Sequence, residues 1–260
     1  MKRILSLALC ALLTLPLLAG CGIRKSHSTW VIAVDGDFSP FVYAGADGKA
    51  AGLDVELLDA IARDQGFQYE LRPSDWDTAM GVFTSHQAQV LMGSIAATQS
   101  RIDEGWAFSR SFYDGVTQSM AMEPSSDTNT LEDLSGKAVA VVSGTLGAAY
   151  AASVKDRYGF SIAAFSDSHA MYAAVLKGLA AACFEDTPAL RDSIRSGVAL
   201  ELVPGSEGDI SNYSVAICDK KNREFLEMFD RGLENIRASG VYDSILAKYA
   251  ASLQSDSPQK

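Results

Sequence analysis

The stretch KAVAVVSGTLGAAYAASV, residues 137–154, contains a strand, a turn and a helix in that order. Residues 137–142 form a short apolar run that predicts a strand, and residues 143–147 carry glycine and hydroxyl residues typical of a turn. Residues 148–154 follow a helical pattern. Short apolar runs and helical patterns alternate in the same way along the rest of the chain. This alternation predicts an α/β fold with parallel sheets and helices on both faces.

The remaining predicted elements follow from the same patterns. Turn residues or caps bound most of them, such as Gly66 after the first helix. The irregular segment 123–133 predicts a surface loop, and residues 120–122 are a candidate crossing between two halves. The predicted strands are 30–34, 67–72, 90–92, 162–165, 182–184 and 213–218, and the predicted helices are 53–65, 76–84, 171–178, one starting at 222, and 241–253.

The N-terminus has the features of an export signal. Lys2 and Arg3 precede an apolar run at residues 4–18, which is shorter than the roughly 20 residues of a membrane span. The run ends in Leu-Ala-Gly-Cys, which resembles a bacterial lipoprotein cleavage box. We therefore expect a signal peptide at 1–20, acyl lipid (palmitate) on Cys21, and a lipid-anchored leash at 21–28. An ordinary signal peptide with a chance cysteine is the alternative.

Composition limits the function classes. The formal net charge of −10 becomes −12 when Lys2 and Arg3 leave with the signal peptide, and this acidity argues against nucleic-acid binding. The three histidines have no metal-ligand spacing and no nucleotide or hydrolase motif is present, so we expect no metal and no cofactor. Cys183 and Cys218 could form a disulfide in an oxidising compartment, but their strand-like surroundings favour two buried free thiols.

Four predicted strand ends carry groups that suit a zwitterion. Ligands in open α/β sheets lie beyond the carboxyl ends of strands. There, Arg101 can grip a carboxylate through two parallel hydrogen bonds, the amides of residues 145–147 face an anion at a helix start, and Asp186 can hold an ammonium group. Phe38 and Trp76 can supply apolar walls.

Four motifs, in order, resemble the polar amino-acid group of the bacterial extracellular solute-binding proteins, family 3, which are receptors of ABC importers. They are GLDVELLDAIA, SIAATQSR followed by FSRSFYDG, DLSGKAVAVVSGT, and SGVYDSILAKYA. The resemblance implies a type II periplasmic-binding-protein fold, in which two α/β lobes with mostly parallel sheets are joined by two hinge strands and clamp a ligand. It places lobe 1 at 29–114 and 213–252, lobe 2 at 115–212, and a polar tail at 253–260.

The resemblance also implies roles for nine residues. It implies that the ligand carboxylate is bound by Arg101 and Thr145, the ligand ammonium by Asp186, Ser94 and Ala96, and the ligand side chain by Asp35, Phe38, Trp76 and Glu185. The family usually has Ser or Thr where Ala96 stands, so one hydroxyl contact is missing. Simpler alternatives remain for most of them. Arg101 could pair on the surface with Asp103 or Glu104, Thr145 could be only a helix cap, and Asp186 only a turn residue. Phe38 and Trp76 could be core residues, and Asp35 and Glu185 could be solvated loop acids.

These features predict a binding protein without enzymatic activity. We expect a monomer that captures a free amino acid, with a polar or cationic side chain favoured by Asp35 and Glu185, and presents it to an ABC permease. We expect it on the extracytoplasmic face of the cell membrane, at the cell surface or in a periplasm. The main alternative is a cyclohexadienyl (prephenate-type) dehydratase on the same scaffold, with Glu185 as a candidate acid. A sensor domain ranks lower.

Overall fold

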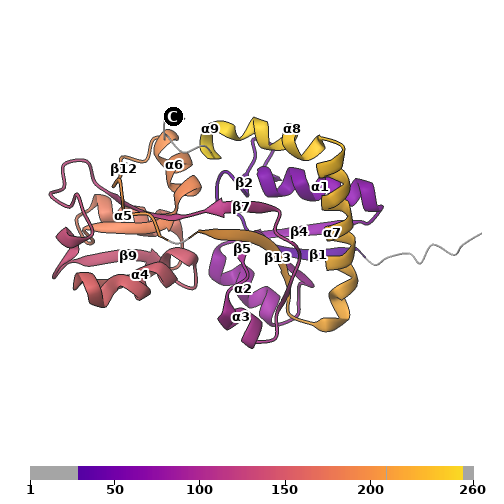
Figure 1. The fold of residues 1–260 in the computed structure, drawn as a ribbon, viewed down its shortest axis with the longest axis horizontal. Coiled ribbons are helices and arrows are strands. Elements are labelled where there is room, and N and C mark those ends of the chain that lie inside the picture. Colours follow the sequence, from indigo (N-terminus) through magenta and orange to yellow (C-terminus); the bar gives the residue numbers. More distant parts are fainter. Residues whose placement is uncertain (1–28, 209, 254–260) are drawn as a thin grey trace, which may run out of the picture.

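Two separate β-sheets organise the chain, and each forms the centre of one lobe (Figure 1). The computed structural model describes residues 29–208 and 210–253. The predicted signal peptide, Cys21 and the leash at 21–28 lie outside the described residues, as do residues 254–260 of the predicted tail. Leu253, which the predicted helix 241–253 and the predicted tail 253–260 both include, ends the last helix.

Lobe 1 contains a six-stranded sheet in the order β4-β1-β5-β13-β6, with β7 also beside β13. Helices α1 and α7 pack on one face, where α1 buries Leu57, Leu58 and Ile61 against Phe225 and Phe229 of α7. Helix α2 packs on the other face. The strands are β1 (Trp30–Asp35), β4 (Tyr69–Ser74), β5 (Val90–Ala96), β6 (Ala107–Phe108), β7 (Tyr113–Val116) and β13 (Ser211–Ile217). The helices are α1 (Leu53–Gln65), α2 (Trp76–Thr84), α3 (Gln99–Asp103), α7 (Arg223–Ala238), α8 (Val241–Lys248) and α9 (Ala250–Leu253).

Lobe 2 contains a five-stranded sheet in the order β10-β9-β11-β8-β12. Its strands are β8 (Gln118–Met122), β9 (Ala138–Val142), β10 (Ser161–Phe165), β11 (Ala182–Asp186) and β12 (Glu201–Leu202). Its helices are α4 (Leu146–Tyr158), α5 (Ser168–Leu176) and α6 (Thr187–Arg195), with α4 and α5 packed on the sheet. The short hairpin of β2 (Tyr43–Ala44) and β3 (Ala50–Ala51) and the 3₁₀ turns Glu132–Leu134 and Lys220–Asn222 complete the elements.

Both sheets are mixed rather than mostly parallel. In each, three neighbouring strands are parallel, β4-β1-β5 and β10-β9-β11, as the βα alternation predicts. The strands that follow a crossing between the lobes, β8 and β13, run antiparallel to their neighbours. The candidate crossing at residues 120–122 is therefore wrong, because these residues lie inside β8 in the lobe 2 sheet. Strands β7 and β13 pair with each other and lead from one lobe to the other (Figure 1).

The strongest sequence signals gave the most accurate boundaries. The helices predicted at 53–65 and 76–84 have these bounds, and Gly66 closes the first in the left-handed conformation. The helix predicted at 148–154 is longer, because Thr145 caps its start and Gly159 its end. The predicted helix 241–253 is two helices, α8 and α9, that meet at Tyr249.

Neither Cys183 nor Cys218 is part of a disulfide. Cys183 is fully buried in β11, whereas Cys218 follows β13 and is only partly buried. Its thiol lies 3.2 Å from the carbonyl oxygen of Phe83 and 3.4 Å from Nδ1 of His86. The prediction of free thiols is confirmed, and the prediction that both are buried is wrong for Cys218.

Gly147 allows helix α4 to approach strand β11 closely. A Cβ atom at this position would lie 2.5 Å from the carbonyl oxygen of Phe184, a backbone atom that cannot move aside cheaply. We expect Gly147→Ala to lower the free energy of unfolding by about 1–3 kcal/mol, measured by denaturant titration. Gly81→Ala is the matched control, since Gly81 lies in α2 and a Cβ atom there would have nothing within 4 Å. That change should stabilise the protein by about 0.5–1 kcal/mol, and equal effects of the two substitutions would contradict the packing argument.

Candidate functional site

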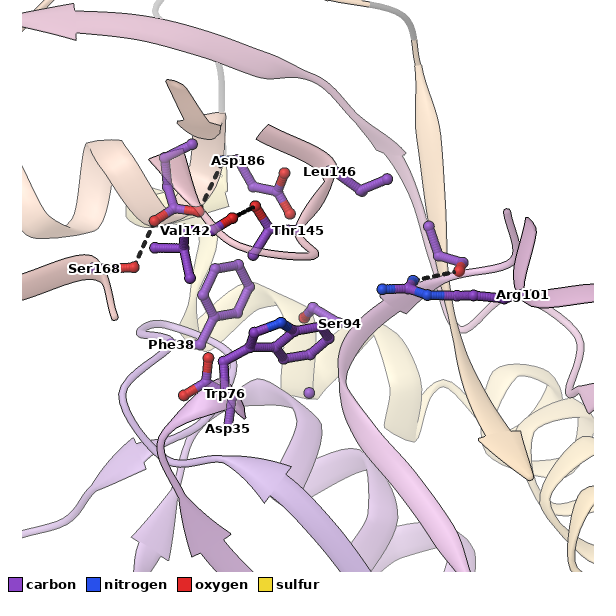
Figure 2. A pocket seen from close by; sticks show the side chains of 13 residues that line it. Asp35, Phe38, Trp76, Ser94, Arg101, Val142, Thr145, Leu146, Ser168 and Asp186 are labelled. Carbon is purple, nitrogen blue, oxygen red and sulfur yellow. Dashed lines mark hydrogen bonds between the residues drawn. The ribbon is translucent and has the colours of Figure 1, made fainter. Parts of the chain in front are cut away.

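One cavity between the lobes contains all nine residues predicted to form a site (Figure 2). It encloses about 430 Å³ of space between atoms, part of it open to solvent. Lobe 1 contributes Asp35, Phe38, Trp76, Gly93, Ser94, Ala96 and Arg101, and lobe 2 contributes Val142, Thr145, Leu146, Ser168, Glu185 and Asp186. The structure therefore brings together side chains that are up to about 150 positions apart in the sequence, and it does so at the carboxyl ends of β1, β5, β9 and β11.

Arg101 is held in place by contacts from both lobes. Its Nη1 donates to the carbonyl of Ala96 at 2.8 Å, and its Nη2 crosses to lobe 2 and donates to the carbonyl of Gly144 at 3.1 Å. The guanidinium carbon lies 5.8 Å from the ring centre of Trp76 and 5.6 Å from that of Trp106, within the range of cation–π attraction. Helix α3, which begins after the cap Thr98, carries Arg101 to this position.

The alternative of a surface arginine is excluded. The Arg101 side chain is buried, with 9% of the residue exposed, and no carboxylate of the described residues lies within ion-pair distance of it. Asp103 instead accepts a hydrogen bond from Gln99 at 2.8 Å. A guanidinium has five N–H donors, so Arg101 keeps donors for a further acceptor after its two bonds to carbonyls. Burial lowers the pKa of the guanidinium from its usual value, an effect that the nearby Glu104 and Asp186 oppose.

Asp186, the last residue of β11, is buried on the lobe 2 side of the cavity. Its carboxylate accepts a hydrogen bond from Nε2 of Gln118 at 3.0 Å and another from the hydroxyl of Tyr213 in the lobe 1 sheet. The side chain makes no capping bond to α6, so a local turn role does not account for its position. Burial raises the pKa of Asp186 to about 6, although Tyr213, Gln118 and Arg101 all favour the ionised form.

Two further carboxylates, Asp35 and Glu185, line the same cavity. Glu185 accepts a hydrogen bond from Oγ of Ser168 at 2.6 Å, and burial together with the charge of Asp186 raises its pKa to about 8. Burial also raises the pKa of Asp35 to about 6, with the negative charges of Asp37 and Asp75 adding to the effect. In Figure 2 the rings of Phe38 and Trp76 stand between Asp35 and the lobe 2 residues Val142 and Thr145.

The raised carboxyl pKa values give a direction to the pH dependence of stability without ligand. Asp35 shifts from 3.8 to about 6, and Glu185 from 4.5 to about 8, so the folded protein binds protons more tightly than the unfolded chain. The resulting stabilisation is present at low pH and is lost as the pH rises through these folded values. We expect the free energy of unfolding, measured with urea, to fall between pH 5 and pH 9. Glu185→Gln should flatten the upper half of this curve, and a wild-type stability that rises over this range would contradict the argument.

Thr145 is the N-cap of α4, as the simpler alternative proposed. Its Oγ1 accepts from the amide of Ala148 at 3.2 Å and donates to the carbonyl of Val142 at 2.7 Å. The hydroxyl is therefore already used within the turn, so any contact with an anion falls mainly to the free amides of the first helical turn.

Ser94 and Ala96 lie on the lobe 1 side, in the last three residues of β5. Ser94 has a positive φ of 60°, and its buried Oγ has no well-formed hydrogen bond within the described residues. The carbonyl of Ala96 receives one bond from Arg101, so it serves first to orient the guanidinium.

Sequence reasoning missed several residues at the cavity. Ser168 follows the end of β10, and the rule that flagged the other strand ends would have found it. Val142 and Leu146 directly flank the flagged turn at 143–145. Gln118 and Tyr213 could not be predicted from the sequence. They bond to Asp186 only because the chain crosses between the lobes and brings them beside it.

Within the described residues, no group of three or more His, Cys, Asp or Glu side chains is arranged to hold a metal ion. No helix in the described part of the chain is both long and apolar enough to span a bilayer.

The two sheets, the paired crossing strands and the cavity between the lobes define a type II periplasmic binding protein. The model of the bacterial extracellular solute-binding proteins, family 3, matches residues 30–252, and the chain belongs to this family. These are binding proteins of transporters and not enzymes, which decides against the dehydratase alternative.

Relatives of this chain bind amino acids according to their names. The "Probable histidine-binding protein" of Neisseria gonorrhoeae is 24% identical over 261 residues, covering 96% of each chain. The L-cystine-binding protein TcyJ of Escherichia coli K12 is 22% identical over 255 residues, covering 93% of this chain and 94% of TcyJ. The crystal structure of the arginine-, lysine-, histidine-binding protein ArtJ from Geobacillus stearothermophilus matches with a TM-score of 0.76 at 25% identity, covering 85% of this chain and 95% of ArtJ.

Proposed function

We propose that this protein captures a free amino acid with a cationic side chain and presents it to the permease of an ABC importer. The observation that carries the proposal is the set of charged groups in the cavity, where one guanidinium, Arg101, meets three carboxylates, the buried Glu185 and Asp186 and the partly buried Asp35. A zwitterion uses Arg101 for its carboxylate and Asp186 for its ammonium. Asp35 and Glu185 then remain. With its pKa raised to about 8, Glu185 is largely protonated at neutral pH without ligand, and a positive side chain would favour its ionised form as well as compensate Asp35.

The flat walls of the cavity support the same ligand class. Phe38 stacks on the buried Phe41 with ring centres 5.5 Å apart, and Trp76 lies beside Arg101. Such rigid aromatic faces can bind the alkyl stem or a planar cationic end of a side chain. The names of the relatives include both cationic ligands and cystine, so family membership does not decide the charge of the ligand side chain. The carboxylates of this chain support the cationic class.

Capture by this mechanism involves binding and closure without covalent chemistry. The amino acid binds one lobe, and the other lobe then closes over it, bringing the lobe 2 residues onto the ligand's charges. We propose 29–114 with 213–252 and 115–212 as the two bodies that move. Closure removes water from the cavity and strengthens every charged contact inside it.

A thermal-shift screen over the amino acids tests the proposal. A true ligand raises the melting temperature with the logarithm of its concentration relative to Kd. We expect arginine, lysine, ornithine or histidine to give the largest shift, and citrulline, a neutral analogue of arginine with nearly the same shape, to give a smaller one. A larger shift with citrulline than with arginine would refute the cationic ligand class. A screen in which no amino acid shifts the melting temperature would refute the function.

The membrane attachment and partners complete the proposal. We infer that Cys21 carries lipid, that residues 21–28 act as a tether, and that the protein works as a monomer beside its permease on the extracytoplasmic face of the membrane. Cell fractionation tests the anchor, since Cys21→Ala should move the protein from the membrane fraction to the soluble fraction. Retention of that variant in the membrane would refute it.

A further inference from the structure

Next to Ser94, which lines the cavity, lies a buried carboxylate that has no role in the proposed binding of the ligand. Asp54 is the second residue of α1 and is 1% exposed, and it does not line the cavity. Its Oδ2 accepts a hydrogen bond from the backbone amide of Ser94 at 3.0 Å. Its Oδ1 is buried without a well-formed hydrogen bond in the described part of the chain, as is the Oγ of Ser94.

A buried carboxylate in this state requires an explanation, because buried polar groups in native proteins are nearly always hydrogen-bonded. Stabilisation of the helix start is one explanation, since acids in a first turn interact well with the helix dipole. The structure argues against it as the main role. The hydrogen bond of the carboxylate leads across to the end of β5 rather than to an amide in the first turn of α1.

The position of Ser94 shows what this bond supports. Ser94 has a φ of 60°, in the left-handed region that a residue with a Cβ atom rarely occupies, and such conformations persist where surrounding contacts enforce them. This conformation occurs at the point where β5 reaches the cavity that Ser94 lines. The start of α1 is itself fixed, since the amides of Leu53 and Asp54 donate to the carbonyls of Pro40 and Phe41 at 3.0 Å. Asp54 is thus a rigid support for Ser94.

We propose that Asp54 is a positioning residue, which holds the backbone of Ser94 so that the Ser94 hydroxyl faces the ammonium group of the ligand. The inference rests on the proposed function, in which Ser94 is one of the ammonium-binding residues. In the ligand-bound protein the Ser94 hydroxyl would donate a hydrogen bond to the unpaired Oδ1 of Asp54 and direct its own lone pairs at the cation. Burial raises the pKa of Asp54 to about 7. A positive charge bound in the cavity would lower this pKa and favour the ionised carboxylate.

A double-mutant cycle in ligand affinity tests the role. We expect Asp54→Ala to weaken binding of the amino acid about tenfold or more, as for other contacting pairs. In a Ser94→Ala background the same change should weaken binding less than about twofold, because the hydroxyl that Asp54 positions is already absent. Asp54→Asn, which keeps an oxygen for the Ser94 amide, should retain more affinity than Asp54→Ala. Asp59→Asn is the matched control, an exposed acid in the same helix, and should leave affinity unchanged.

Amide hydrogen exchange measured without ligand tests the contact itself. The Ser94 amide should exchange slowly in the wild type and in Asp54→Asn, and faster in Asp54→Ala. Rapid exchange of this amide in the folded wild type would overturn the inference even if the alanine variant did not fold. So would a folded Asp54→Ala with wild-type affinity, or an equal loss of affinity in the Ser94→Ala background. A wild-type protein that binds no amino acid would overturn the proposed function as well. The affinity outcomes above require a wild type that does bind, so the two failures can be told apart.

Discussion

Arg101→Ala is expected to weaken amino-acid binding by about 10²–10³-fold or more in isothermal titration calorimetry. Removing one partner of a buried charge pair leaves the other charge uncompensated, which costs about 3–5 kcal/mol. Arg101 is the sole cation that lines the cavity, and the described structure shows no second basic group there that could replace it. The variant also loses the bond from Arg101 to the carbonyl of Gly144, which joins the two lobes.

Arg101→Lys separates charge from geometry. A lysine keeps the positive charge but cannot form two parallel hydrogen bonds to a carboxylate, nor stack its head group between Trp76 and Trp106 as a planar guanidinium does. We expect it to recover only part of the lost affinity. Arg63→Ala, on the exposed side of α1, is the control and should bind normally. Wild-type affinity in Arg101→Ala would show that the ligand carboxylate binds elsewhere.

Asp186→Asn is expected to weaken binding by about 10²-fold, because it removes the charge that faces the ligand ammonium while keeping the size of the side chain. The amide also adds N–H groups where the carboxylate now accepts bonds from Tyr213 and Gln118. The loss should therefore appear mainly in the rate of dissociation.

An analogue without the α-ammonium group makes this test specific. The wild type should prefer the amino acid strongly over its α-hydroxy acid, and Asp186→Asn should reduce that preference. Asp156→Asn, an exposed acid on α4, is the matched control in the same lobe. An equal loss of affinity for the amino acid and the hydroxy acid would contradict the assignment of Asp186 to the ammonium group.

The sequence predicted which residues line the cavity better than it predicted the directions of the strands. The rule that ligands lie at the carboxyl ends of strands needs only the strands and the next few residues, so it located Asp35, Ser94, Thr145 and Asp186 without knowledge of the topology. The family resemblance then combined residues from different lobes. The direction of β8 and β13 could not be obtained in this way, because an apolar run gives no sign of whether its neighbour is parallel.

The supporting residues were beyond sequence reasoning for a related reason. Asp54 reads as an ordinary first-turn acid of an amphipathic helix, and Tyr213 as an apolar strand residue. Their roles appear only when β5 and β11 are placed next to them, which depends on contacts 40 and 27 positions apart in the chain. Periodicity describes one element at a time and contains no information on such contacts.

The hydrogen bond between Tyr213 and Asp186 has a consequence for how a transporter recognises a loaded receptor. Tyr213 belongs to a hinge strand of lobe 1 and Asp186 to lobe 2, so their bond, like that between Arg101 and Gly144, joins the two lobes and would favour closure even without ligand. If the protein serves a permease as proposed, a receptor that closes without ligand would compete for that permease with loaded ones. A receptor with Tyr213→Phe should shut less often when empty, and so bind its cargo more weakly while giving the permease a clearer distinction between empty and full.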